Sequence, residues 1–147
     1  MGRLVPPCIS GDTDWMGEGN IELVRGAFEA FTRRDVDAAL AMADPDVEFY
    51  GPTASLAGHE TPYRGHDGLR RYFDDVATIW EVLEVVPHEF REVGDEVVAL
   101  GRVYGRGPHG LLVDSPTGWV WRVQNGKVVA CRVYTSRQEA LDAAGAG

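Results

Sequence analysis

Two side chains close together in one segment, Arg102 and Tyr104, are of types that can act on an oxygen atom of a small molecule. A tyrosine hydroxyl can serve as a general acid or donate a hydrogen bond to a carbonyl or epoxide oxygen. An arginine guanidinium can stabilise an oxyanion or orient a carboxylate. Both residues also have a plainer interpretation: Tyr104 ends a strand with its hydroxyl in water, and Arg102 forms a structural ion pair with an acid on a helix. We treat both as candidate catalytic residues.

Aromatic side chains form the second candidate group. Trp119 and Trp121 occupy alternate positions of a predicted strand, so they share one face, and its apolar character predicts that this face lies inside. Together with Phe49 and Tyr63 they could hold a flat apolar ligand by stacking, with plain core packing as the alternative. Alternation along the other predicted strands adds further inward positions. The predicted ligand-binding residues are Phe49, Tyr63, His88, Trp119, Trp121, Cys131 and Val133.

The histidines give weaker signals. His88 could act as a base near neutral pH, although a histidine on a strand is more often a structural residue. His59 and Glu60 are adjacent in a predicted loop and suggest an acid–base pair, which a solvent-exposed loop explains equally well. No two His or Cys residues have ligand spacing on one element, and the glycine-rich segment 105–110 lacks the lysine and helix of a phosphate site. We therefore expect neither a metal nor another cofactor.

Length and charge narrow the class of protein. A chain of 147 residues predicts one domain with a substantial core. Its hydrophobic fraction of 44% and aromatic fraction of 10% are not those of a disordered chain. With 23 acidic and 14 basic residues, the net charge is −9. Such a surface repels phosphate groups, so we expect no nucleic-acid partner and no binding to an anionic membrane.

The cysteines and the N-terminal residues indicate the cellular compartment of the protein. Cys8 and Cys131 are far apart and form no disulfide framework. No apolar run has the length of a transmembrane helix, and the N-terminus lacks the apolar centre of a secretory signal. We therefore expect a reducing, cytoplasmic location. Residues 1–18 lack periodicity and are interpreted as a flexible leader, within which Met16 could be the true start.

Helical periodicity occurs in three places. A helix is predicted from an Asn20 N-cap onward, with apolar residues on one stripe down to Phe31. A short second helix is predicted after an Asp35 cap and ends before Pro45. After a strand at 47–50 and a loop at 53–66, a third apolar stripe runs from Leu69 to Leu83.

The rest of the chain has the alternation typical of strands. Segments 84–92 and 96–106 flank the hairpin signal Gly94-Asp95. Segments 111–115 and 117–124 form one strand or two, and the turn signal Asn125-Gly126 precedes a strand at 127–135. A capping box at 136–139 opens a terminal helix, and residues 144–147 are expected to be a disordered tail.

This order of elements predicts an α+β fold. Helices collected on one face of a curved antiparallel sheet form a cone, and its concave side can enclose a central pocket. Residues 19–143 are expected to form this single domain.

Four segments carry a resemblance to a known family: FEAFTRRDVDAALAMADPDVEFYGP (28–52), PYRGHDGLRRYF (62–73), GDEVVALGRVYGRG (94–107) and WVWRVQNGKVVACRVYTSRQEAL (119–141). The sequence resembles the SnoaL-like, nuclear-transport-factor-2-like superfamily over about residues 20–143. The resemblance implies the cone fold, which hosts isomerases, epoxide hydrolases, dehydratases, polyketide cyclases and non-enzymatic domains.

The catalytic residues of the better-known members are missing. By this resemblance, Gly51, Ala27 and Trp119 stand where ketosteroid isomerases have an Asp base, a Tyr and a protonated Asp. Arg102 matches the arginine of limonene-epoxide hydrolases, but their two aspartates correspond to Tyr104 and Val133. Neither reaction is therefore expected in its usual form.

The resemblance also assigns faces of the sheet. It implies that Arg102 and Tyr104 point inward, whereas periodicity alone places the valines of 97–103 inside. The opposite face, with Arg122, Arg132 and Tyr134, often forms the homodimer in this superfamily, so we expect a dimer there.

Two hypotheses follow for the function. The first is a small-molecule-binding protein that acts as a cofactor-free isomerase, cyclase, dehydratase or hydrolase on a hydrophobic oxygenated metabolite. The second is a non-catalytic homodimeric ligand-binding or scaffold protein. A solvent-filled cavity beside Arg102 favours the first, and a packed interior favours the second.

Overall fold

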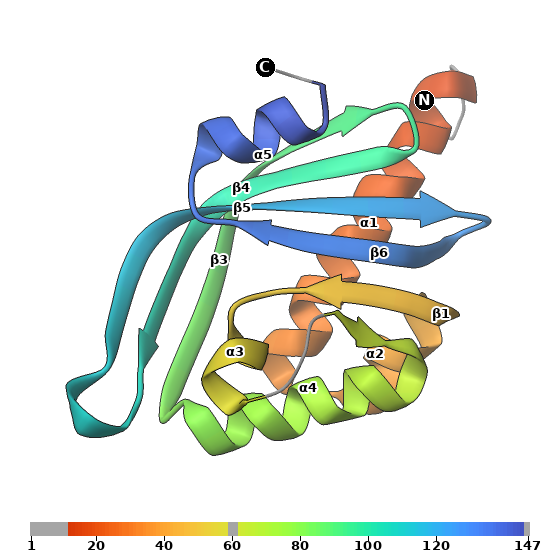
Figure 1. Ribbon diagram of the computed structural model, residues 1–147. Helices are drawn as coiled ribbons and strands as arrows, with labels where there is room; N and C mark the ends of the chain where they lie inside the picture. Colours follow the sequence, from red (N-terminus) through yellow and green to blue (C-terminus); the bar gives the residue numbers. More distant parts are fainter. Residues whose placement is uncertain (1–11, 59–61, 146–147) are drawn as a thin grey trace.

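The computed structural model of the chain describes residues 12–58 and 62–145 and has a mixed α+β architecture (Figure 1). Its sheet has six strands in the order β2-β1-β6-β5-β4-β3, and it is curved and does not close. The elements are α1 (Asp12–Arg33), α2 (Val36–Met42), β1 (Ala43–Tyr50), α3 (Thr53–Ala57), β2 (Tyr63–Arg64), α4 (Gly65–Ile79), β3 (Val82–Val93), β4 (Glu96–Arg106), a 3₁₀ turn (Pro108–Gly110), β5 (Leu112–Gln124), β6 (Lys127–Tyr134) and α5 (Arg137–Ala143).

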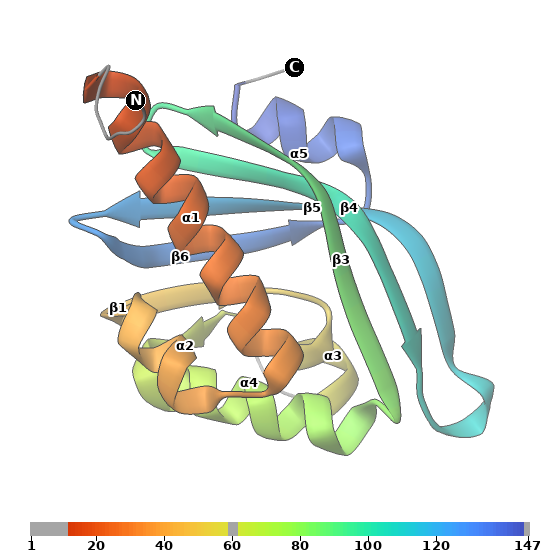
Figure 2. The ribbon, with the colours of Figure 1, turned by 180° about the vertical axis from the view of Figure 1, so that it is seen from behind.

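The helices divide between the two faces of the sheet. Helix α1 runs across the concave face, with α2 and α4 beyond β1, and α5 lies on the opposite face (Figures 1 and 2). Neighbouring strands pair antiparallel except for β1 and β6, which are parallel. The predicted cone of sheet and helices is thereby confirmed, while the parallel pair was not predicted. No described helix is long and apolar enough to cross a membrane.

The N-terminal helices differ from the prediction in one respect. Helix α1 begins at Asp12, so Asn20 is not its N-cap and the part of the predicted leader from Asp12 onward is helical. The cap of α2 is as predicted, because the Asp35 carboxylate accepts a hydrogen bond from the backbone N–H of Ala38 at 3.1 Å. Residues 1–11 and 146–147, which include most of the predicted leader and part of the predicted tail, lie outside the described residues.

The segment predicted as a loop at 53–66 contains two short elements. Helix α3 occupies Thr53–Ala57, and β2 pairs with β1 through Tyr63 and Phe49. These elements are too short for periodicity to reveal. Helix α4 ends at Ile79, so Leu83, predicted at the end of the helical stripe, belongs to β3 instead.

The predicted turns and the C-terminal cap are confirmed. Residues 112–124 form one strand, β5, and the Asn125-Gly126 turn has positive φ at both residues, 53° and 75°, as a type I′ turn requires. The Ser136 hydroxyl accepts a hydrogen bond from the backbone N–H of Glu139 at 3.0 Å, which opens α5 as predicted.

Two irregularities shift the alternation of strands. In β3 the register changes between Pro87 and Glu89, so Val85 and Phe90 pack against the concave core while Val86 is exposed. Between β5 and β6 the register changes, because Arg122 pairs with Ala130 and Val123 pairs with Val128. Val128 therefore faces the concave side, although alternation predicts the opposite. A bulge moves later residues to the other face, which a strict period of two does not anticipate.

Candidate functional site

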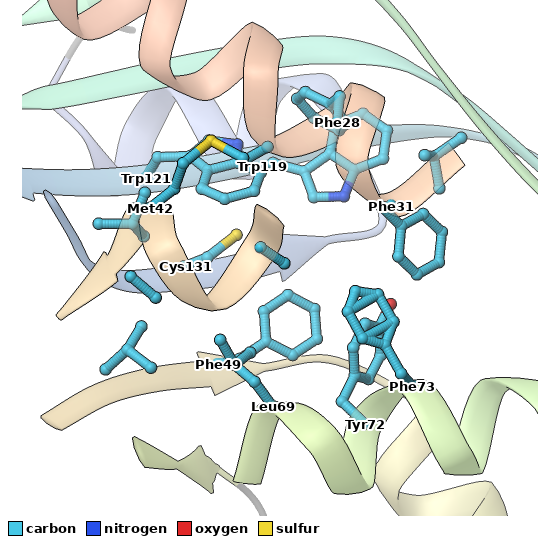
Figure 3. A pocket seen from close by; sticks show the side chains of 16 residues that line it. Phe28, Phe31, Met42, Phe49, Leu69, Tyr72, Phe73, Trp119, Trp121 and Cys131 are labelled. Atoms are coloured by element: carbon cyan, nitrogen blue, oxygen red, sulfur yellow. The ribbon is translucent and has the colours of Figure 1, made fainter. Parts of the chain in front are cut away.

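A cavity of about 90 Å³ lies between the concave face of the sheet and helices α1, α2 and α4 (Figure 3). Small, aliphatic and sulfur-containing side chains line part of its wall. The aromatic residues that line it are Phe28, Phe31, Phe49, Tyr72, Phe73, Trp119 and Trp121. Helices α1 and α4 and strands β1 and β5 contribute these rings, so the cavity exists only in the folded chain.

Edge-to-face contacts hold the rings of the sheet side. The Phe28 ring on α1 lies 5.0 Å from the Trp119 ring and 5.2 Å from the Trp121 ring, at steep angles to both. On the opposite wall, the Tyr72 ring lies 4.5 Å from Phe49 and 5.7 Å from Phe31. Such pairs stabilise by about 0.5–1.5 kcal/mol beyond burial. They hold two walls of flat rings around the cavity.

Few polar atoms belong to this lining. They belong to the side chains of Tyr72, Trp119, Trp121 and Cys131, and Figure 3 shows the Trp119 nitrogen turned toward the space between the two walls. Among the described residues, Trp121 Nε1 is a buried nitrogen without a hydrogen-bond partner. No lining residue among those described is a carboxylate, an imidazole or a cation.

Burial fixes the protonation of both titratable lining groups. It raises the pKa of the Tyr72 hydroxyl well above its usual value, with Cys131 adding to the effect and Arg34 opposing it. Burial also raises the pKa of the Cys131 thiol. At neutral pH Tyr72 is therefore a hydrogen-bond donor, and Cys131 is a thiol with little nucleophilic character.

A buried polar pair lies behind the Phe49 and Tyr72 rings. The Tyr63 hydroxyl donates a hydrogen bond to Asp75 at 2.6 Å, and these two residues are only 3% and 7% exposed. Burial, followed by the hydrogen bond to Asp75, raises the pKa of Tyr63. The Tyr63 ring packs 5.4 Å from Tyr72 but does not line the cavity. The pair therefore supports one wall of the cavity without touching its interior.

The two candidate catalytic residues do not lie at the cavity. Arg102 is on the outer face of β4, where Nε lies 2.9 Å from Asp114 Oδ1 and both side chains are more than half exposed. Tyr104 is 37% exposed on the same face. The inward orientation implied by the resemblance is therefore wrong. Val97 and Ala99 fill the concave side, as periodicity alone predicts.

The other candidates divide between the cavity, its surroundings and the surface. Phe49, Trp119, Trp121 and Cys131 line the cavity, and Val133 packs against the adjoining core cluster. His88 is exposed at the irregularity of β3, so its predicted inward position is wrong. A role of these residues in ligand binding stays a prediction. His59 and Glu60 lie outside the described residues.

None of the cavity residues on the helices was predicted as a site residue, and four of them are aromatic. Phe28, Phe31, Tyr72 and Phe73 belong to the apolar stripes that predicted the helices. A stripe identifies the buried face of a helix but does not separate core contacts from the wall of a cavity. Within residues 12–58 and 62–145, no group of three His, Cys, Asp or Glu side chains could hold a metal ion.

Comparisons with known proteins agree with this architecture. The SnoaL-like domain family matches residues 24–131. An NTF2-like protein of unknown function from Burkholderia pseudomallei K96243 is 30% identical, with 84% of this chain and 95% of that chain covered and a TM-score of 0.72. TerC, co-crystallised with polyporic acid, is 24% identical over 86% of this chain and 98% of its own, with a TM-score of 0.71. No curated protein matches this chain.

A putative SnoaL-like polyketide cyclase from Jannaschia sp. CCS1 has the same fold. It is 21% identical, with 88% of this chain and 94% of that chain covered and a TM-score of 0.66. The curved sheet and its helices thus have the NTF2-like, ketosteroid isomerase-like fold. The chain belongs to the SnoaL-like domain family.

Proposed function

We propose that the protein binds an apolar small molecule that carries an oxygen atom, and that the aromatic cavity is the binding site. The observation that carries this proposal is the cavity lining itself, in which seven aromatic side chains, Tyr72 and Trp119 among them, surround one space. Flat rings favour stacking with an aromatic or conjugated ligand. The O–H and N–H groups are suited to donate hydrogen bonds to a carbonyl or epoxide oxygen.

The missing charges of the lining support a neutral occupant. Moving a charged group into an apolar site is costly unless a partner charge or several hydrogen bonds compensate it. The described lining offers no ionised side chain. TerC, whose likeness to this chain concerns the fold alone, was co-crystallised with a small molecule, polyporic acid.

Binding can be tested with a panel of apolar ketones, quinones and epoxides by isothermal titration calorimetry. We expect at least one compound to bind. Its affinity should be about fivefold or more lower in Tyr72→Phe and Trp119→Phe, because each substitution removes a hydrogen-bond donor but keeps a ring. Tyr104→Phe is the matched control, since this tyrosine is on the outer face and should leave affinity unchanged. If Tyr104→Phe weakens binding and Tyr72→Phe does not, the cavity is not the site.

A second candidate function is cofactor-free catalysis at the same cavity, as an isomerase, cyclase, dehydratase or hydrolase. It is favoured by the Tyr72 hydroxyl, a neutral acid beside the proposed ligand position. Mass spectrometry of the incubated panel separates this function from binding alone, because conversion gives an isomeric, hydrated or dehydrated product. If catalysis occurs, Tyr72→Phe should lower turnover more than tenfold, whereas unchanged turnover would exclude Tyr72 as the acid.

We also propose a homodimer through the outer face of β5 and β6. Arg122 and Arg132 are exposed there, and the Arg132 guanidinium lies 4.0 Å from the Tyr50 ring centroid. Tyr134 is partly covered by packing against the α5 cluster. Sedimentation of Arg132→Glu should give a monomer if this face forms the dimer, with Arg70→Glu on α4 as the control. A dimer that survives Arg132→Glu would contradict the proposed interface.

A further inference from the structure

The size of the cavity limits what it can hold. Binding sites for drug-sized ligands have volumes of about 300–1,000 Å³, and a cavity of about 150 Å³ holds one benzene. The cavity here has about 90 Å³, which is smaller than either, so it takes no more than one ring, and its lining side chains must shift to admit that ring. A ligand longer than that must extend into adjoining space.

The adjoining space is a groove of about 420 Å³ between α1 and β3. Phe28 and Val85 line both the cavity and the groove, so these two side chains form the boundary between them. The Phe28 ring lies 5.0 Å from Trp119 on the cavity side and 6.1 Å from Phe90 on the groove side. The aromatic wall of the cavity therefore continues across Phe28 onto the floor of the groove.

The rim of the groove has a different chemistry from the cavity. Arg25, Glu29 and Arg33 succeed one another at intervals of four residues along α1 and line the same side of the groove. The Arg25 guanidinium lies 4.5 Å from the Phe90 ring centroid, next to the boundary. Its ion pair with Glu22 is long, 3.5 Å, and both side chains are more than half exposed. Such a pair contributes little and can be exchanged for another anion.

We infer that the ligand is elongated and amphipathic: a neutral ring occupies the cavity, and an anionic end lies in the groove beside Arg25. This inference rests on the proposed function, because it assigns the remainder of the ligand bound at that same cavity. The Phe90 floor takes the apolar chain that joins the two ends. Glu29, which is also on the rim, opposes the anion, so the two rim charges should act on affinity in opposite directions.

Three probes of increasing length test the inference by calorimetry: acetophenone, 6-oxo-6-phenylhexanoic acid and the methyl ester of that acid. The ester should bind more tightly than acetophenone, because its chain buries apolar surface in the groove. The acid should bind about fivefold more tightly than the ester, the upper range for an exposed charge pair. In 1 M salt this preference for the acid should decrease.

Rim variants identify the charges responsible. Arg25→Gln should abolish the preference for the acid over the ester, and Glu29→Gln should increase it. Arg70→Gln is the matched control, because Arg70 has a similar exposure on α4 and lies outside the groove. Circular dichroism and thermal unfolding check that the variants are folded.

Each outcome has a distinct meaning. Equal affinity for acid and ester in the unmodified protein would overturn the anionic end. Equal affinity for acetophenone and the ester would overturn the extension into the groove. A protein that binds none of the three probes and no member of the ketone, quinone and epoxide panel would overturn the proposed function, and this inference with it.

Discussion

Replacement of Tyr63 by phenylalanine removes one hydroxyl from the buried pair behind the cavity. That hydroxyl donates to Asp75 at 2.6 Å, and Asp75 is 7% exposed. The ring, which packs against Phe49 and Tyr72, is unchanged by the substitution. Tyr63→Phe therefore measures the hydrogen bond and not the packing.

The expected cost follows from burial and charge. A hydrogen bond to an ionised group contributes about 1.5–3 kcal/mol, and its loss leaves the buried carboxylate with one donor fewer. For a domain of this size, 1 kcal/mol corresponds to about 2–4 °C in Tm, so we expect a decrease of roughly 3–12 °C. The total stability of such domains is only about 5–15 kcal/mol, so the loss is easily measured.

Urea denaturation of Tyr63→Phe and Tyr50→Phe provides the comparison. The Tyr50 hydroxyl also donates to a carboxylate, Glu48, at 3.1 Å, but in a partly exposed position. Its removal should cost less than about 1 kcal/mol, because water replaces the lost bond. If both variants lose the same free energy of unfolding, the buried pair does not have the role assigned to it here.

Three further predictions concern other parts of the molecule. Burial raises the pKa of Tyr72 above the ordinary value of about 10. The contribution of Tyr72 to stability is therefore complete below about pH 10 and is lost as the pH rises through the raised pKa. The free energy of unfolding should decrease less steeply with alkaline pH in Tyr72→Phe. In Gly118→Ala the new Cβ lies 2.3 Å from the Ala140 Cβ on α5, so thermal unfolding should show a stability loss of about 1–3 kcal/mol. Gly19→Ala, whose new Cβ has no neighbour within 4 Å, should gain up to about 1 kcal/mol of stability. Arg102→Gln should change stability by less than about 1 kcal/mol and leave ligand affinity unchanged in calorimetry, since its pair with Asp114 is exposed; a tenfold loss of affinity would restore Arg102 as a site residue.

Local signals predicted most of the elements of the fold. The Asp35 and Ser136 caps and the Asn125-Gly126 turn act within a few residues, so their sequence is sufficient to identify them. Periodicity also placed Trp119 and Trp121 on the concave face correctly, because no irregularity interrupts β5 at that point. These features depend on neighbours along the chain or across one strand pair.

The rest of the site depends on contacts between distant segments. The parallel pairing of β1 with β6 joins residues on opposite ends of the chain, and no local pattern encodes it. The irregularity in β3 turns His88 outward although its neighbours suggest an inward position. The resemblance placed Arg102 and Tyr104 inside because relatives have functional residues there, whereas alternation in this chain favours its valines.

The lining of the cavity also explains why a chain without the expected catalytic acids can keep an open interior. Trp121 Nε1 is buried without a partner, and such a group costs about 1–3 kcal/mol that phenylalanine at the same position would avoid. A scaffold selected only for stability has no use for that indole or for the Tyr72 hydroxyl beside an unfilled space. Edge-to-face contact with Phe28 fixes the Trp119 ring in one wall, and the Tyr63–Asp75 hydrogen bond supports the other. The cost at Trp121 and the open space are therefore better explained by a ligand than by packing alone.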